Sequence, residues 1–152
     1  MDDALAPVSL VPVGAGTWRA VAELKVAPEQ ARFVAAPTHY LALCAYKDVW
    51  HPLAVTSADG DVVGFLMWGV DDEDGSCWLG GILVDAARQR RGVGRAALVE
   101  ALALLRERAG DAGFALSYQP ENTVAKALYA SLGFVETGEV DGDEVVARRL
   151  PT

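Results

Sequence analysis

The strongest constraint on the fold is the stretch 78–98, W-L-G-G-I-L-V-D-A-A-R-Q-R-R-G-V-G-R-A-A-L. The apolar run ending at Val84 predicts a strand, and the segment from Gly92 onward predicts a helix that opens with two glycines. Glycine lets a ligand approach the backbone, and the first N–H groups of a helix lack intrahelical partners at its positive dipole end. The stretch therefore predicts a strand–turn–helix unit with an anion site, most often for phosphate, at the helix start. Four arginines crowd the same turn: Arg88, Arg90, Arg91 and Arg95.

Length and composition predict one globular domain covering 1–152. No apolar run approaches the roughly 20 residues of a membrane span, and the N-terminus lacks the features of a signal peptide. Cys44 and Cys77 lack metal-ligand spacing, so we expect no metal site and a cytoplasmic location. The net charge of −8 argues against nucleic acid as a partner and favours a cationic small molecule.

The hydrophobic pattern predicts strands and helices in a mixed order. We expect strands at 8–13 (an edge strand), 53–57, 62–70, 77–84, 114–118, 134–139 and 144–150, and helices at 18–25, 29–36, 38–48, 92–109 and 122–132. Three successive strands joined by tight turns predict an antiparallel meander, which disfavours a purely parallel doubly wound sheet. The fold class is therefore α/β (α+β), with a mixed, mostly antiparallel sheet of roughly six to seven strands and helices on both faces.

Two phosphate-binding interpretations of the glycine turn compete with an ordinary solvated, arginine-rich turn. Residues 92–97 match the dinucleotide fingerprint G-x-G-x-x-A, but seven residues separate Val84 from Gly92 and antiparallel strands precede the turn. A P-loop is excluded because the sequence contains no G-x-x-x-x-G-K-[ST]. The larger unit, Q-x-x-G-x-G at 89–94, offers the second interpretation.

This unit resembles the acyl-CoA motif of the GNAT N-acetyltransferase superfamily, which cradles a pyrophosphate with backbone N–H groups. A second segment, 122–134, is similar to the downstream family motif N-x-x-A-x-x-L-Y-x-x-x-G-F. The two motifs occur in the family order, and the resemblance covers essentially the whole chain. It implies the GNAT fold, acetyl-CoA as cosubstrate, and a homodimer as a reasonable oligomeric state.

Shorter segments resemble the spermine/spermidine acetyltransferase-like branch of this superfamily: 27–35, 63–65, 117–122 and 137–147. The branch implies a polyamine or similar small cationic amine as the acceptor. Gly80 and Gly81 depart from the larger residues that the branch carries in this strand. An aminoglycoside, an amino acid or a protein N-terminus are alternative acceptors, and a non-catalytic acyl-CoA-binding sensor is an alternative function.

The resemblance also implies site residues. The backbone of Leu83 and Val84 would bond the pantetheine arm, and Tyr129 would be the general acid that protonates the leaving thiolate. Asn122 would touch the CoA arm, cap its helix, or do both. The pyrophosphate cradle would comprise Gln89, Arg90, Arg91, Gly92, Val93, Gly94 and Arg95.

The general base stays open at the level of sequence. Relatives keep a glutamate in the strand that here runs from 77 to 84, and this chain has none there. A water chain, Glu29, Glu121 or Glu144 could serve. Neither cysteine has a paired base, so we expect direct transfer in a ternary complex. The acidic turn 71–74 could attract a polyamine or simply be solvated.

Overall fold

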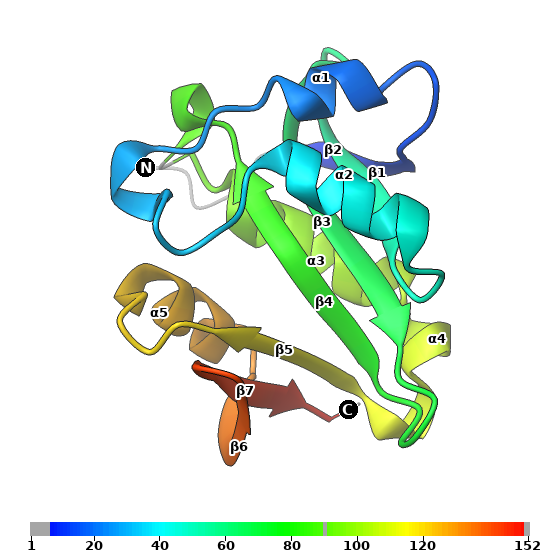
Figure 1. Cartoon of the computed structure of the whole chain (residues 1–152), viewed down its shortest axis with the longest axis vertical. Coiled ribbons are helices and arrows are strands. Elements are labelled where there is room, and N and C mark those ends of the chain that lie inside the picture. The colour runs from blue at the N-terminus through cyan, green and yellow to red at the C-terminus, as the bar shows by residue number, and fades with distance from the viewer. Residues whose placement is uncertain (1–6, 90, 151–152) are drawn as a thin grey trace.

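A seven-stranded sheet organises the computed structural model, which describes residues 7–89 and 91–150 (Figure 1). The strands are β1 (Val8–Pro12), β2 (His51–Ser57), β3 (Val62–Val70), β4 (Cys77–Val84), β5 (Phe114–Tyr118), β6 (Val135–Asp141) and β7 (Glu144–Arg149). The helices are α1 (Trp18–Ala22), α2 (Pro37–Tyr46), α3 (Val93–Leu104), α4 (Arg106–Ala109) and α5 (Thr123–Ser131). Three 3-10 turns complete the described part: η1 (Pro28–Gln30), η2 (Ala86–Arg88) and η3 (Gly110–Ala112).

The strand order is β1-β2-β3-β4-β5-β7-β6, with β1 at an edge as predicted. Strands β2 to β4 form the expected three-stranded antiparallel meander, and β1 pairs antiparallel with β2 at its edge. Strands β5, β7 and β6 form a second antiparallel set. The two sets meet at the parallel pair β4–β5. This architecture confirms the predicted fold class.

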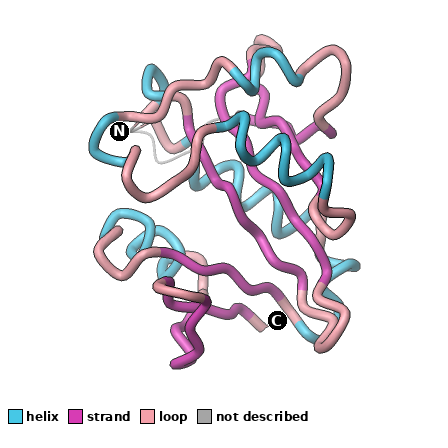
Figure 2. Tube along the Cα trace, viewed as in Figure 1, coloured by secondary structure: helices cyan, strands magenta, loops and turns pink. Residues whose placement is uncertain are grey.

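Strands β4 and β5 pair only at their beginnings. Cys77 lies opposite Phe114 and Trp78 opposite Ala115, and no further pair is formed. Beyond that point the two strands diverge, as Figure 2 shows. The edge of β4 that faces β5 is therefore without a strand partner from Leu79 to Val84.

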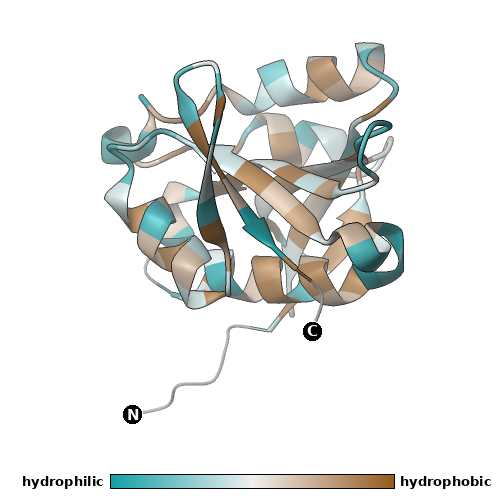
Figure 3. Ribbon diagram, turned by 90° about the horizontal axis from the view of Figure 1, so that it is seen from below, coloured by the Kyte–Doolittle hydropathy of each residue, from teal (hydrophilic) through white to brown (hydrophobic). Residues whose placement is uncertain are grey.

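Alternating residues of the central strands pack into two separate hydrophobic cores, one on each face of the sheet. Phe65 and Met67 of β3 pack with Val21 of α1 on one face, whereas Leu66 packs with Leu98 of α3 on the other. Helices α1 and α2 thus cover one face and α3 the opposite face (Figure 1). Figure 3 shows hydrophobic residues along the central strands, and hydrophobic and hydrophilic residues alternating along the helices.

The helices differ from prediction in the N-terminal half and in α3. The predicted helix 29–36 is only the turn η1, since Pro37 forces Ala36 into an extended conformation with ψ 149°. The predicted helix 92–109 breaks at Leu105 into α3 and α4. None of the described helices has the length and apolar character needed to cross a membrane.

Helix α1 ends at Ala22 rather than at Lys25 because the backbone of Lys25 bonds elsewhere. Its N–H donates to Asp85 Oδ1 at 3.0 Å, and its carbonyl accepts from the Ala86 N–H at 2.6 Å. These two bonds fasten the segment after α1 to the loop after β4. Thr17 does not cap the helix with its side chain, because its Oγ1 accepts from the Gly14 N–H at 2.9 Å.

A β-bulge interrupts β4 where it leaves β5. Phe65 lies opposite Leu83 and Met67 opposite Gly80, so β4 carries one extra residue between these pairs. Gly81 in this bulge has φ +59°, a conformation that favours glycine. A Cβ on Gly81 would lie 3.2 Å from the rings of Tyr40 and Phe65. Gly81 is thus required by the backbone and by its close neighbours.

We expect Gly81→Ala to lower the free energy of unfolding by more than about 1–3 kcal/mol, because the positive φ alone costs that much. The contacts with Tyr40 and Phe65 add to the cost. Gly138→Ala is the matched control, since φ is +90° there and nothing lies within 4 Å of the added Cβ. Gly16→Ala, with no neighbour and no positive φ, should be neutral. Urea denaturation measures all three, and a Gly81→Ala protein as stable as Gly16→Ala would contradict the bulge assignment.

Candidate functional site

Three adjoining cavities follow the gap between β4 and β5. The first, the helix cleft, lies among the end of β4, the start of α3 and helix α5 and has a volume of about 320 Å³. The second, the gap cavity, lies between the diverging strands and has a volume of about 200 Å³. The third, the acidic groove, measures about 840 Å³ and includes the turn 71–74.

Shared residues join these cavities into one passage. Ile82, Asn122 and Tyr129 line both the helix cleft and the gap cavity. Trp50, Trp78 and Asp141 line both the gap cavity and the acidic groove. Two molecules that enter from opposite ends could therefore meet in the gap cavity.

The helix cleft has the features of an anion site. Gly92 precedes α3 with φ +76°, and the Ala96 N–H makes the first intrahelical bond, to the Gly92 carbonyl at 2.9 Å. The N–H groups of Val93, Gly94 and Arg95 come before that bond, so they have no acceptor within the helix. All three residues line the cleft. Backbone donors at the positive end of a helix suit a phosphate group.

Two side chains that the sequence predicts for the pyrophosphate cradle hold the turn that leads to α3 in position. Gln89 Nε2 donates to the Val84 carbonyl at 2.9 Å, and Arg95 donates to Ser131 Oγ of α5 at 2.7 Å. Both residues also line the helix cleft, as do Leu83 and Val84. Gln89 thus fixes the position of the glycine turn against the end of β4.

The arginines of the turn have different positions. Arg88 lines the helix cleft and lies 3.5 Å from an Asp61 carboxylate oxygen. Arg91 is exposed and does not line the cleft. Arg90, a predicted cradle residue, lies outside the described residues.

Asn122 and Tyr129 stand where the helix cleft meets the gap cavity. Asn122 is 7% exposed, and its Oδ1 accepts from the Ala125 N–H at 3.3 Å. It therefore caps α5 and also faces the passage, so both predicted roles are compatible with its position.

Tyr129 is 8% exposed, and none of the described residues hydrogen-bonds to its hydroxyl. Burial raises the pKa of this phenol, and the nearby Glu144 carboxylate, Tyr118 and Tyr40 raise it further. A phenol in these surroundings stays neutral at pH 7 and retains a proton to donate. The free hydroxyl of Tyr129 is thus a proton donor facing the passage.

The gap cavity holds polar residues that sequence reasoning did not single out. Tyr40 Oη accepts from the Ala35 N–H at 3.0 Å, and burial raises the pKa of its phenol. Ser117 Oγ donates to Glu144 Oε1 at 2.7 Å. Tyr40 lies on α2 and Ser117 on β5, far apart in the sequence, and no sequence pattern gave either residue a role. Only the fold brings them together.

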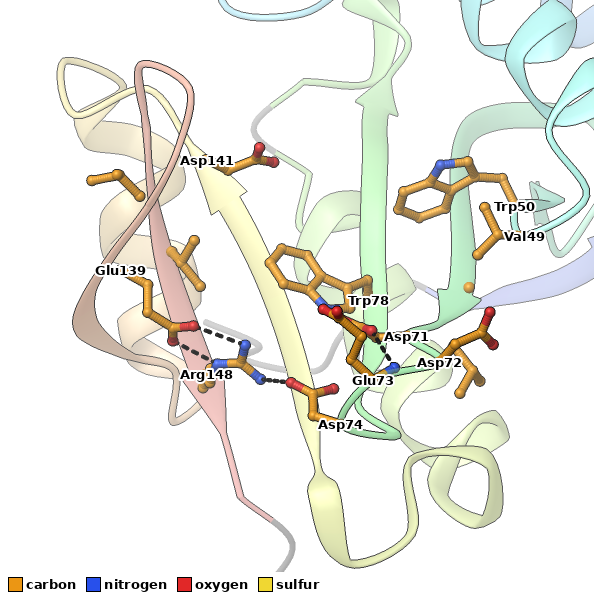
Figure 4. Close-up of a pocket in the computed structure, with 14 residues that line it drawn as sticks. Val49, Trp50, Asp71, Asp72, Glu73, Asp74, Trp78, Glu139, Asp141 and Arg148 are labelled. Atoms are coloured by element: carbon orange, nitrogen blue, oxygen red, sulfur yellow. Dashed lines mark hydrogen bonds and ion pairs between the residues drawn. The ribbon is translucent and has the colours of Figure 1, made fainter.

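Carboxylates dominate the acidic groove (Figure 4). Six line it, namely Asp71, Asp72, Glu73, Asp74, Glu139 and Asp141, with Arg148 as the one guanidinium among its lining residues. Arg148 Nε donates to Glu139 at 2.7 Å, and its Nη1 lies 3.3 Å from Asp74. The groove thus retains an excess of negative charge, which attracts cations.

The carboxylates of Asp71 and Asp74 hold the turn 71–74 in shape. Asp71 Oδ1 accepts from the Glu73 N–H at 2.8 Å, and Asp74 Oδ1 accepts from the Ser76 N–H and hydroxyl at 2.9 and 2.6 Å. The bonds from Ser76 lower the pKa of Asp74, as does the charge of Arg148. Asp74 is therefore ionised at neutral pH.

Aromatic rings form walls of the acidic groove. Trp50 and Trp78 line it, and the Arg148 guanidinium lies 5.6 Å from the centre of the Trp78 ring. The buried Trp78 Nε1 has no hydrogen-bond partner in the described part of the chain. Tryptophan faces attract organic cations, so the groove combines carboxylates with cation–π surfaces.

Other chemistries find less support in the described residues. No group of three histidine, cysteine, aspartate or glutamate side chains that could hold a metal occurs within 7–89 and 91–150. Cys44 and Cys77 are free, and burial raises the pKa of each thiol to about 11. Neither cysteine lines the passage, nor do His39 and His51.

Comparison with known proteins agrees with this arrangement. Residues 18–134 match the acetyltransferase (GNAT) family. A 100-residue stretch is 32% identical to a spermine/spermidine N(1)-acetyltransferase of Bacillus subtilis, spanning 60% of this chain and 66% of that relative, just under two thirds of its length.

Solved structures share the fold at low sequence identity. A domain from Methanocaldococcus jannaschii has a TM-score of 0.77 at 13% identity, with 96% of this chain and 99% of that chain covered. Spermidine N-acetyltransferase from Vibrio cholerae, solved with CoA and spermine, has a TM-score of 0.70 at 18% identity, with 93% and 92% covered. With the family match over most of its length, the chain belongs to the GNAT acetyltransferase family.

Proposed function

We propose that this protein transfers the acetyl group of acetyl-CoA to a primary amine of a polyamine or similar small cationic amine. The observation that carries the proposal is the continuous passage from the helix cleft to the acidic groove, with the unbonded Tyr129 hydroxyl at the inner junction. Acetyl-CoA would supply a reactive thioester, and the chain would position it and the amine.

The helix cleft fits the donor. The N–H groups at the start of α3 would bond the pyrophosphate, and Gln89 keeps the glycine turn in place against Val84. The free edge of β4, including Leu83 and Val84, would bond the pantetheine arm as an added strand does. This edge is free because β5 diverges from β4 after Trp78.

The acidic groove fits a cationic acceptor. A polyamine carries several ammonium groups separated by short alkyl chains, and carboxylates along a groove with tryptophan walls match that pattern. The named activities of the Bacillus subtilis and Vibrio cholerae proteins support the same acceptor class.

Tyr129 would act as the general acid. Its neutral phenol would protonate the leaving sulfur as the C–S bond breaks. Transfer would be direct, because the two cysteine thiols are protonated at neutral pH and lie outside the passage. A cytoplasmic location, in keeping with the free cysteines, and a homodimer are also part of the proposal.

Acetyl-CoA should raise the melting temperature of the wild-type protein, by an amount corresponding to about 2.7 kcal/mol at a ligand concentration of 100 Kd. Gly94→Glu should abolish this shift, because a carboxylate would occupy the cradle and repel phosphate. Gly94 suits this test, since its added Cβ would meet Val84 at an ordinary 3.5 Å. Ala103→Glu, exposed on the same helix, is the matched control. Protection by NAD but not by acetyl-CoA would instead support a dinucleotide site.

Thiol release from acetyl-CoA should accelerate with spermine and spermidine more than with an aminoglycoside, an amino acid or a peptide N-terminus. Asp72→Asn should raise KM for spermine roughly two- to fivefold, because it removes one groove charge in contact with solvent. Asp59→Asn, an exposed change outside the groove, should leave KM unaltered. If no amine accelerates thiol release, the result favours the alternative function, a non-catalytic acyl-CoA-binding sensor.

Tyr129→Phe should lower kcat about 100-fold and leave acetyl-CoA binding unchanged, because only the proton donor is removed. Tyr46→Phe is the control, as Tyr46 is 87% exposed. Steady-state kinetics and the acetyl-CoA melting shift measure the two quantities. Wild-type turnover in Tyr129→Phe would remove this hydroxyl from the mechanism.

A further inference from the structure

The general base is the part of the mechanism that the sequence left open. Of the three glutamates considered, Glu29 and Glu121 are exposed and line none of the three cavities of the passage. Glu144 is half-buried and lines the gap cavity together with Tyr129. The structure therefore separates candidates that the sequence could not rank.

We propose that Glu144 is the general base that takes a proton from the acceptor ammonium in the gap cavity. This inference rests on the proposed acetyltransferase function. It places the base on the first residue of β7 rather than on β4, and it places base and acid in one cavity on two different elements.

A single hydrogen bond orients the Glu144 carboxylate. Ser117 Oγ donates to Oε1 at 2.7 Å, and no other described residue donates to this carboxylate. Ser117 belongs to β5, the strand that diverges from β4, so the bond holds the carboxylate at the wall of the gap. The acceptance of one hydrogen bond leaves the carboxylate with further lone pairs for a substrate proton.

The other titratable groups of the gap cavity come from four of the elements around it. They are Tyr40 of α2, Tyr118 of β5, Tyr129 of α5 and Asp141 of β6. No lysine, arginine or histidine is among the described residues that line this cavity. The carboxylates of the gap cavity therefore have no cationic side chain beside them among its described lining residues, and the ammonium group of a bound amine would supply the positive charge.

The negative charge of Glu144 affects the pKa of Tyr129, the proposed acid. After burial, this carboxylate is the largest cause of the raised pKa of Tyr129, and it also raises the pKa of Tyr40. The charge of the Glu144 carboxylate therefore favours the protonated form of Tyr129, which is the form that a general acid requires.

The protons and bonds balance with these two groups. Glu144 takes one proton from the ammonium, and the freed lone pair forms the C–N bond at the thioester carbonyl carbon. The C–S bond breaks, and the sulfur takes the Tyr129 proton. Tyr129 regains a proton from the nitrogen as the amide forms, and Glu144 releases its proton to solvent. The products are the N-acetylated amine, CoA thiol and one proton.

The test is the pH profile of kcat/KM for Glu144→Gln with spermine, after melting curves confirm folding and acetyl-CoA binding. We expect about a 100-fold loss at pH 7. The remaining rate should rise about tenfold per pH unit toward the amine pKa near 10, because only amine already deprotonated in solution can react. The wild-type profile should be much flatter over this range.

Further variants keep the test decisive. Glu144→Asp should retain the flat profile with a reduced rate, and Ser117→Ala should lower kcat about three- to tenfold through loss of orientation. Glu29→Gln and Glu121→Gln, both exposed, are the matched controls and should behave as wild type. A Glu144→Gln profile that coincides with that of the wild type overturns the proposal.

Asp141→Asn provides the competing outcome, since Asp141 also lines the gap cavity. If this variant and not Glu144→Gln acquires the steep pH dependence, Asp141 is the base and the proposal is wrong. Failure of the proposed function would appear differently, as a wild-type protein that releases no thiol with any amine.

Discussion

The divergence of β4 from β5 is the constraint on which the site depends. Parallel strands normally satisfy each other's backbone groups along their length, yet here only two residue pairs do so. The rest of the β4 edge needs other hydrogen-bond partners, and a bound chain with amide groups could supply them. The same divergence opens the cavity that Tyr129 and Glu144 both line.

Separate parts of the molecule hold this gap open. The bulge at Gly81 turns β4, while β7 pairs with the far side of β5 and keeps it away. The bonds between Lys25 and the loop after β4 place the N-terminal segment against the helix cleft. The site is thus built from segments that are distant in the sequence, and its geometry depends on the sheet as a whole.

Much of the fold could be predicted from local patterns. The strands Cys77–Val84 and Phe114–Tyr118 have the predicted bounds because apolar runs between turn residues specify them well. The helix expected at 29–36 was wrong, because Pro37 and the contacts of the neighbouring Lys25 overrode a helical composition. Tertiary bonds of this kind leave no local signal.

The candidate site likewise contains some residues that the sequence could identify and others that it could not. The glycine turn and Tyr129 carry motifs, so the donor side could be found from sequence. Tyr40 and Trp50 carry none, because their importance comes from the position at which α2 and the loop before β2 reach the gap. Ser117 lies in a segment with a family resemblance, but that resemblance gave it no role. Glu144 was one candidate of several until burial and its bond to Ser117 distinguished it.

The two adjacent glycines of β4 differ in how easily the structure would accept a side chain. Gly81 is fixed by its backbone angle, whereas Gly80 has no positive φ and lines the gap cavity. A Cβ on Gly80 would meet the flexible Met67 methyl at 3.3 Å and the Trp50 ring at 3.5 Å. A single side chain at position 80 would therefore narrow the gap cavity without rebuilding the strand, so this one position controls how large a molecule the cavity admits.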